Sequence, residues 1–348
     1  MANLHDRSCK RRGKLGAHYM NTSLDCIPCI IRQALEAARL VSTDAADHEK
    51  TLRAVLRWTG EMDLNLSPPF IAQRIHRFLR DLTNIQDPYR VAKDAQNRMA
   101  LALFPDLKIQ VANAADPLIM ALRLALAGNN IDMGVFRDVN ESMVQASIHQ
   151  ALTEPFAGDA EAFRSAVAQA GYILYLADNA GEIVFDRLLI EQLAPARVTV
   201  AVRGAPVIND ATISDARTIG LCDVVEVIGN GSDAPGTLLD SCSPEFQRCF
   251  AQADLVIAKG QGNFETLSDF PGNIIFLFKA KCPVIANYAQ VPLGAGVLRG
   301  PEVRGIHIGT SRGLVDTTIK ELPIGRTGRS VQCQQPKDKA DDGCSTWC

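Results

Sequence analysis

The chain has no excess of positive charge, because its 348 residues carry 36 lysines and arginines against 39 aspartates and glutamates, a formal net charge of −3. Binding to a phosphate backbone depends on a basic surplus, so the composition argues against a nucleic-acid partner. Long hydrophobic runs are also missing. The longest apolar stretches, such as 172–177 and 274–278, are far shorter than the ~20 residues that span a bilayer. We therefore expect no membrane partner either.

We expect neither a secretory signal nor a structural zinc site. The first nineteen residues are basic in places but have no apolar run behind them, as a signal would need. Cys26 and Cys29 form a C-x-x-C pair, but the core holds no second such pair to complete a zinc site. The scattered core cysteines are typical of reduced thiols in a cytoplasmic protein. A redox role for Cys26 and Cys29 and a purely structural role both stay open.

Histidine is absent from every loop that follows an expected strand, which disfavours a histidine-based nucleophilic triad. His76 lies in an amphipathic stretch and is expected at the surface or half-buried. The overall composition, 47% hydrophobic and 22% charged, is that of a globular protein. Its length corresponds to roughly two domains.

The first part of the chain, residues 22–170, has the periodicity of consecutive helices. Apolar residues from Ile27 to Ala38 recur at spacings of three and four, which places them on one helical face. Ser67 and Pro68 have the pattern of an N-cap followed by a first-turn proline. Residues 1–21 are expected to be a flexible extension.

The pattern changes at residue 171, where short apolar runs begin to alternate with helical stretches. These runs are typical of strands buried on both faces. They occupy residues 172–177, 198–202, 224–228, 255–258, 274–278 and 284–286. The alternation predicts an α/β fold for residues 171–311, a Rossmann-like, doubly wound and mostly parallel sheet (α/β/α) that follows an all-helical N-terminal domain. Residues 312–348 are polar and aperiodic, which predicts a disordered tail.

Polar side chains stand where the predicted strands end. Asp178 and Asn179 follow the first strand, and Asp210 closes the segment after the second. Ligands of open parallel sheets bind outside the carboxyl ends of the strands, so these side chains are expected at one edge. Carboxylate and amide oxygens suit a hard divalent cation such as Mg²⁺ or Mn²⁺ better than zinc.

Lysines and glycines stand at the neighbouring strand ends. Gly231 and Ser232 follow the third strand, Lys259 and Asn263 the fourth, and Lys279 the fifth. Ammonium groups and exposed backbone N–H groups suit a phosphate dianion. Each motif alone is more often a turn or a helix cap, but their joint placement favours metal-assisted phosphoryl transfer.

Four ordered motifs resemble those of the metal-dependent damage-control phosphatase family, whose eukaryotic branch includes a protein named as an acidic-residue methyltransferase. The motifs are Asp-Asn-Ala-Gly-Glu (178–182), Arg-Gly-x-Pro-Val-x-Asn-Asp-Ala-Thr (203–212), Gly-Ser-Asp-Ala-Pro-Gly-Thr (231–237) and Lys-Gly-Gln-Gly-Asn-Phe-Glu (259–265). Further matches at 26–29, 87–89 and 127–134 are similar to the prokaryotic C-x-x-C branch. The resemblance covers about residues 22–300.

The resemblance implies roles for matching positions. Asp178, Asn179 and Asp210 correspond to the family's metal ligands, with Mn²⁺, Co²⁺, Ni²⁺ or Mg²⁺ as the cofactor. Asp178, Lys259 and Lys279 are then expected to be catalytic, with both lysines near the phosphate. The family's sugar-phosphate branch carries Arg-Thr-x-Lys where this chain has 276–279, and only the lysine is kept. This departure argues against fructose 1-phosphate-like substrates.

The substrate is expected to be a small phosphorylated metabolite. Gly231, Ser232 and Asn263, together with Asn179, are expected to orient it. The helical half should contribute Asn129, Asn130 and Asp132.

Two other functions stay open at this point. One is an S-adenosylmethionine-dependent carboxyl methyltransferase, although a glycine-rich loop after the first strand and an acid at the end of the second are not evident. The other is a non-catalytic protein that binds a phosphorylated metabolite. The sequence does not fix an oligomeric state.

Overall fold

A computed structural model describes residues 20–130 and 141–300 of the chain. The helices in these ranges are α1 (Cys26–Val41), α2 (Ala45–Gly60), α3 (Pro68–Thr83), α4 (Arg90–Asn113), α5 (Pro117–Asn130), α6 (Glu141–Thr153), α7 (Ala160–Gln169), α8 (Glu182–Gln192), α9 (Ile213–Thr218), α10 (Pro244–Gln252), α11 (Gly260–Leu267) and α12 (Pro283–Ala289). The strands are β1 (Ile173–Leu176), β2 (Val198–Val202), β3 (Glu226–Gly229), β4 (Leu255–Lys259), β5 (Ile274–Lys279) and β6 (Gly296–Arg299). The expected extension (up to residue 19), the expected tail and Asp132 lie outside the described residues.

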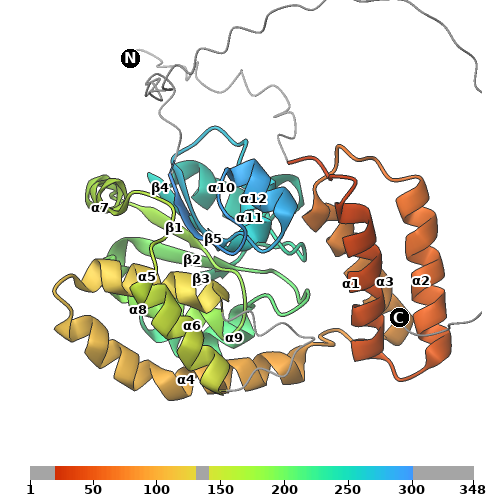
Figure 1. The fold of residues 1–348 in the computed structure, drawn as a ribbon, viewed down its shortest axis with the longest axis horizontal. Helices are drawn as coiled ribbons and strands as arrows, with labels where there is room; N and C mark the ends of the chain where they lie inside the picture. Colours follow the sequence, from red (N-terminus) through yellow and green to blue (C-terminus); the bar gives the residue numbers. More distant parts are fainter. Residues whose placement is uncertain (1–19, 131–140, 301–348) are drawn as a thin grey trace, which may run out of the picture. The chain divides into compact units, whose positions relative to one another are not determined.

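Helices α1 to α3 pack on one another around a small apolar cluster of their own (Figure 1). Ser67 is the N-cap of α3 and Pro68 its first residue, as the sequence predicts. The buried stripe of α3 then repeats at helical spacing through Ile71, Ile75 and Leu79. These residues pack against Ile30, Ala34, Ala37 and Ala38 of α1 and Val55 of α2.

The sheet has the strand order β3-β2-β1-β4-β5-β6. Strands β1 to β5 pair in parallel, and β6 pairs antiparallel with β5. This is the order of doubly wound sheets, in which the chain crosses to opposite sides of the first strand. The predicted fold class, a mostly parallel α/β sheet with a helical N-terminal part, is confirmed.

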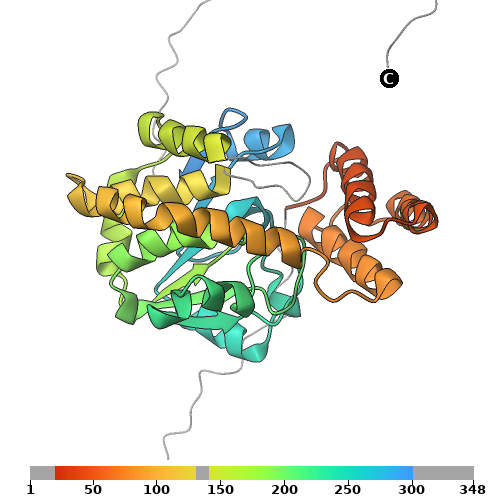
Figure 2. The ribbon, with the colours of Figure 1, turned by 90° about the horizontal axis from the view of Figure 1, so that it is seen from below.

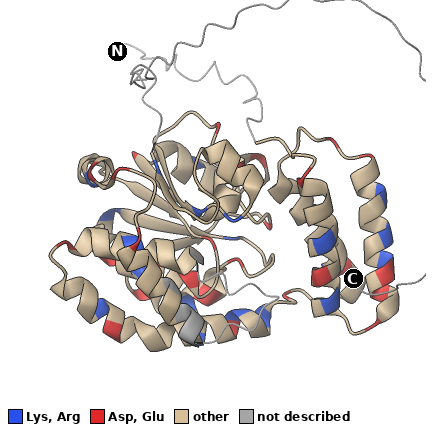
Figure 3. Ribbon diagram, in the orientation of Figure 1, with Lys and Arg blue, Asp and Glu red and all other residues tan. Residues whose placement is uncertain are grey.

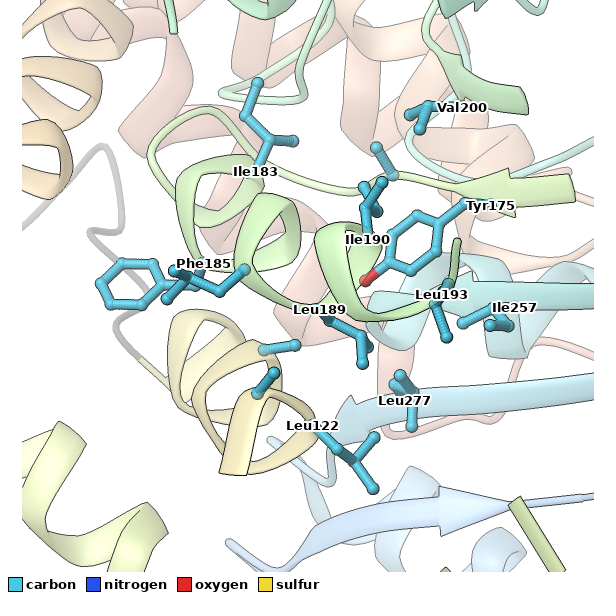
Figure 4. Packing of buried hydrophobic residues seen from close by; sticks show 14 of the residues in the cluster. Leu122, Tyr175, Ile183, Phe185, Leu189, Ile190, Leu193, Val200, Ile257 and Leu277 are labelled. Carbon is cyan, nitrogen blue, oxygen red and sulfur yellow. The ribbon is translucent and has the colours of Figure 1, made fainter. Parts of the chain in front are cut away.

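Both faces of the central strands are covered, which explains why β1, and β4 and β5 up to their last residues, are apolar. Ile173 and Tyr175 of β1 pack toward α4, α5 and α8, which lie along one face (Figure 2). Leu174 and Leu176 point the opposite way, into a second cluster with α10, α11 and α12. Figure 4 shows the first cluster, where Tyr175 and side chains of β4 and β5 face Leu189 of α8.

The strand predicted at 284–286 is wrong, because these residues belong to helix α12. Pro283 occupies its first turn, where its missing N–H costs no hydrogen bond. A run of three apolar residues does not distinguish a buried strand from a buried helix. The sixth strand is instead β6, which the sequence pattern did not reveal.

Charged residues of both signs occur along the helices, as on α1, α2 and α4 in Figure 3. Within residues 20–130 and 141–300, no helix is both long and apolar enough to cross a bilayer. Because β1 lies between β2 and β4, the position where doubly wound sheets bind ligands is beyond the carboxyl ends of β1 and β4. Asp178 follows β1, and Lys259 is the last residue of β4.

Candidate active site

The loops after β1 and β2 are held together by their backbones. Asn179 and Asp210 face each other in an isolated antiparallel bridge. The N–H of Ala180 donates to the carbonyl of Asn209 at 2.8 Å, and that of Ala211 donates to the carbonyl of Asp178 at 2.8 Å. The three residues predicted to bind metal therefore lie on one pair of hydrogen-bonded loops.

The Asp178 carboxylate is buried in a network of amides and acids. Its Oδ2 accepts hydrogen bonds from Asn179 Nδ2 at 2.9 Å and from Asn129 Nδ2 at 3.2 Å. Burial, together with the charges of Glu182 and Asp210, raises the pKa of Asp178 well above its usual range, and Arg203 opposes this shift. Three acidic side chains, Asp178, Glu182 and Asp210, are thus gathered at this edge of the sheet.

Arg203, at the end of β2, sits between the two aspartates. Its Nε donates to Asp210 Oδ2 at 2.7 Å, and its Nη2 is 3.8 Å from Asp178 Oδ1. Burial raises the pKa of Asp210 even against this guanidinium. The buried Nη2 has no hydrogen-bond partner. A buried donor without a partner is costly, and an anionic ligand at this position would satisfy it.

Lys259 is buried behind Asp178 rather than at the open edge. Its Nζ lies 2.6 Å from Glu182 Oε1, 2.5 Å from Asp186 Oδ1 and 3.0 Å from the carbonyl of Ala125. Burial acts against the charged form, but the two carboxylates outweigh it and raise the pKa of Lys259. An ammonium has three N–H groups, so direct contact with a phosphate would require one of these bonds to break.

Asn129 links the end of β5 to the acidic residues. Its side chain accepts the backbone N–H of Lys279 at 2.9 Å and donates to Glu182 at 3.1–3.2 Å as well as to Asp178. The structure thus brings Asn129 into the site, together with the backbone of Lys279. The side chain of Asn130 lies outside the described residues.

The other two substrate-orienting elements meet beside Arg203. Asn263 donates to the carbonyl of Lys259 at 2.7 Å and accepts from Thr237 Oγ1 at 2.8 Å, so its amide joins α11 to the 231–237 loop. The carbonyl of Ser232 accepts the N–H of Gly204 at 2.8 Å. A Cβ at Gly204 would overlap the backbone of Gly231, so this close approach requires glycine.

Helix α3 is tied to the same loop through Asp233. Arg77 Nε lies 2.8 Å from Asp233 Oδ2, Gln73 Nε2 lies 2.7 Å from Oδ1, and Arg80 also donates to this carboxylate. Although burial acts in the opposite direction, these donors lower the pKa of Asp233 to about 2. The helical part therefore closes one side of the site through an ion pair.

His76, one turn before Arg80, is buried, so the surface or half-buried position expected for it is wrong. Its ring is 3.3 Å from the hydroxyl of Tyr89. Burial and the charge of Arg80 lower the pKa of His76 to about 4.

Gly260, the first residue of α11, has a φ of +79° and lies against Asp178. A Cβ at this position would overlap the Asp178 carboxylate. The β4 end therefore approaches the acid as closely as backbone allows. Glycine is the residue that combines this contact with a left-handed conformation.

Sequence reasoning missed Glu182, Asp186 and Arg203. Glu182 and Arg203 stand inside the motifs at 178–182 and 203–212, but nothing in the spacing separates them from surface charges. No three His, Cys, Asp or Glu side chains within the described ranges are arranged as a metal centre by themselves. The expected ligand set differs from such a trio because the amide of Asn179 is one of its three members.

Comparison with known proteins gives the family. The damage-control phosphatase ARMT1-like domain matches residues 22–297, from before α1 into β6. The chain belongs to the damage-control phosphatase family. The resemblance carried by the four motifs is thereby confirmed. The match includes the helical part as well as the sheet.

Archaeal relatives match over nearly their whole length. A damage-control phosphatase of Archaeoglobus fulgidus is 32% identical over 292 residues, which cover 79% of this chain and 97% of the relative. Damage-control phosphatase PH1575 of Pyrococcus horikoshii is 31% identical, with 79% and 96% covered. The crystal structure of a DUF89 family protein from P. horikoshii has a similar fold, with a TM-score of 0.75, 30% identity and coverage of 81% and 99%.

Proposed function

We propose that this damage-control phosphatase family member is a divalent-metal-dependent phosphatase that hydrolyses a small phosphorylated metabolite. The observation that carries the proposal is the backbone pairing of the loops after β1 and β2, because it brings Asp178, Asn179 and Asp210 to one buried edge. Two carboxylates and an amide oxygen are a donor set for a hard cation. Burial raises the pKa of Asp178 and of Asp210, and at Asp178 the charges of Glu182 and Asp210 add to the shift.

Asp178, Asn179 and Asp210 would hold the cation, which when bound polarises a phosphoryl oxygen and orients the attacking water. Arg203 would donate its unpartnered Nη2 to a phosphoryl oxygen beside the aspartates. Lys279, where β5 ends, would add positive charge on the other side of Asn129. Each of these roles uses a group at the carboxyl edge of the sheet.

Lys259 receives a positioning role in this proposal instead of direct phosphate contact. Its ammonium holds Glu182, and Glu182 in turn accepts hydrogen bonds from Asn129 and Asn179. Those two amides donate to Asp178. Lys259 would therefore orient the metal-binding carboxylate through two intermediate side chains.

The residues that stand at the positions of the sugar-phosphate signature support a substrate class other than sugar phosphates. Phe276 and Phe278 point into the core beneath α11, where Phe278 stacks on Phe264 with ring centroids 4.4 Å apart. A polar signature side chain at Phe276 would be buried there without a partner. We infer that Phe276 and Phe278 take no part in recognising the natural substrate, which leaves Lys279 as the residue of β5 near the phosphate.

The proposal is tested by hydrolysis of p-nitrophenyl phosphate after chelation and after addition of Mg²⁺, Mn²⁺, Co²⁺ or Ni²⁺. We expect no turnover with chelator and restored turnover with at least one cation. Binding of phosphorylated metabolites without turnover in any metal would instead favour a non-catalytic protein. A thermal shift with S-adenosylmethionine, in the absence of phosphatase activity, would favour the methyltransferase.

Gly260→Ala is expected to disrupt the site from the first residue of α11, which lies against Asp178. Its Cβ would displace the Asp178 carboxylate, and a misplacement of about 1 Å costs on the order of 100-fold in rate. The left-handed backbone adds about 1–2 kcal/mol of strain. Turnover of p-nitrophenyl phosphate and urea denaturation measure the two effects.

Gly60→Ala is the matched control, because a Cβ at the end of α2 meets nothing within 4 Å. Wild-type turnover in Gly260→Ala would show that the Asp178 carboxylate can move without consequence, against the proposed ligand geometry.

A further inference from the structure

Three cysteines from two distant parts of the sequence line one cavity of about 1060 Å³. Cys26 and Cys29 stand in the first turn of α1, and Cys282 is the N-cap of α12. All three are half-buried free thiols. The cavity therefore gathers three sulfurs that solvent can reach and that the phosphatase proposal does not use.

The two α1 thiols share one side of their helix, since residues three apart on a helix are neighbours. Side-chain amides contact two of the three sulfurs. Gln33 Nε2 is 3.5 Å from Cys29 Sγ, and Gln261 Nε2 is 3.9 Å from Cys282 Sγ. Arg32 also approaches Cys29, with its Nη2 at 4.0 Å from the sulfur.

The thiols and Glu265 act on one another electrostatically. Burial, the charge of Glu265 and the other two thiols raise the pKa of Cys26. Burial, Glu265 and Cys29 do the same for Cys282. Cys26, Cys29 and Cys282 thus line one cavity and influence one another's ionisation, although within the described residues they are not arranged as a metal site. The chemistry that this leaves for them is reaction with one another.

We propose that Cys26, Cys29 and Cys282 form a thiol-oxidation site in which Cys282 becomes disulfide-bonded to the C-x-x-C segment. The oxidant is a hydroperoxide. We assign the first step to Cys29, which Arg32 and Gln33 approach, because the pKa values of the other two thiols are raised. Its thiolate attacks one oxygen of hydrogen peroxide, the O–O bond breaks, a sulfenic acid forms, and the released hydroxide leaves as water with the proton that the thiol gave up. A neighbouring sulfur then displaces the sulfenic hydroxyl, which leaves with the thiol proton as a second water. Two thiols lose two electrons and two protons, and a dithiol reductant restores them.

The bond would join α1 to the segment that leads out of the candidate active site. Cys282 directly follows Lys281, whose positive charge acts on Asp178 and whose backbone N–H donates to Gln261 at 3.2 Å. A disulfide between this segment and α1 would cross the cavity covalently. Oxidation is therefore expected to fix the helical part against α12.

The experiment exposes the reduced, full-length protein to a stoichiometric amount of hydrogen peroxide, blocks the remaining thiols and maps peptides by mass spectrometry without reduction. We expect a peptide containing Cys282 to be linked to the peptide that contains Cys26 and Cys29, and dithiothreitol to separate them. Cys222→Ser, at an exposed thiol outside the cavity, should leave the linked pair unchanged, whereas Cys282→Ser should abolish it.

Three results would overturn the proposal. They are the absence of any Cys282 disulfide, a bond confined to Cys26 and Cys29, and preferential oxidation of Cys222. The experiment measures the mass of a disulfide-linked peptide and not a reaction rate. The disulfide proposal can therefore fail or succeed independently of the phosphatase proposal.

Discussion

Asp178→Asn is expected to abolish metal-stimulated hydrolysis of p-nitrophenyl phosphate, with a loss on the order of 100-fold or more in kcat/KM. Removing one group that stabilises charge in the transition state, such as an oxyanion-hole donor, typically costs about 10²–10³ in rate. The substitution keeps the shape of the side chain but removes the charge that a cation requires. Measurement of kcat/KM across a Mn²⁺ titration separates weaker cation binding from loss of turnover at saturation.

The same variant is expected to keep or raise the melting temperature. Asp178 is buried beside Glu182 and Asp210, so its charge is unfavourable in the folded state without a cation. Asp106→Asn is the matched control, because Asp106 is exposed on α4. It should change neither kcat/KM nor the melting temperature. Full turnover in Asp178→Asn would contradict the ligand assignment.

The sequence predicts the sheet and the position of the acids because both follow from local pattern. A strand covered on both faces is expected to be apolar, as 173–176 and 255–258 are. Parallel strands end at one edge, so Asp178 and the segment after β2 that contains Asp210 lie at the same edge of the sheet. The backbone bridge between Asn179 and Asp210 then fixes which residues of the two loops lie side by side.

The sequence does not reveal which of several chemically equivalent residues forms a given contact, because tertiary packing decides this. Lys259 and Lys279 each end an apolar strand, yet Lys259 is fully buried among acids and Lys279 is partly exposed. The difference comes from Glu182 and Asp186, which α8 presents toward the end of β4. Likewise, the three thiols line one cavity because the N-terminal ends of α1 and α12 both border it.

Lys259→Met is expected to destabilise the protein by about 3–5 kcal/mol, the typical cost of removing one partner of a buried ion pair. Its Nζ is fully buried and serves both Glu182 and Asp186, so both carboxylates would remain in the core without their cation. Methionine fills most of the volume, which limits the contribution of a cavity. The free energy of unfolding is measured by urea denaturation at pH 7.

Lys108→Met is the matched control, because Lys108 pairs with Glu191 at 2.7 Å while its side chain is 54% exposed. An exposed pair contributes about 0–1 kcal/mol, so this variant should unfold close to the wild-type midpoint. Adding Glu182→Gln and Asp186→Asn to Lys259→Met should recover part of the lost stability, because no charge is then buried alone. If the free energy of unfolding falls equally in the two lysine variants, the buried ion pairs of Lys259 do not stabilise the packing of β4 on α8.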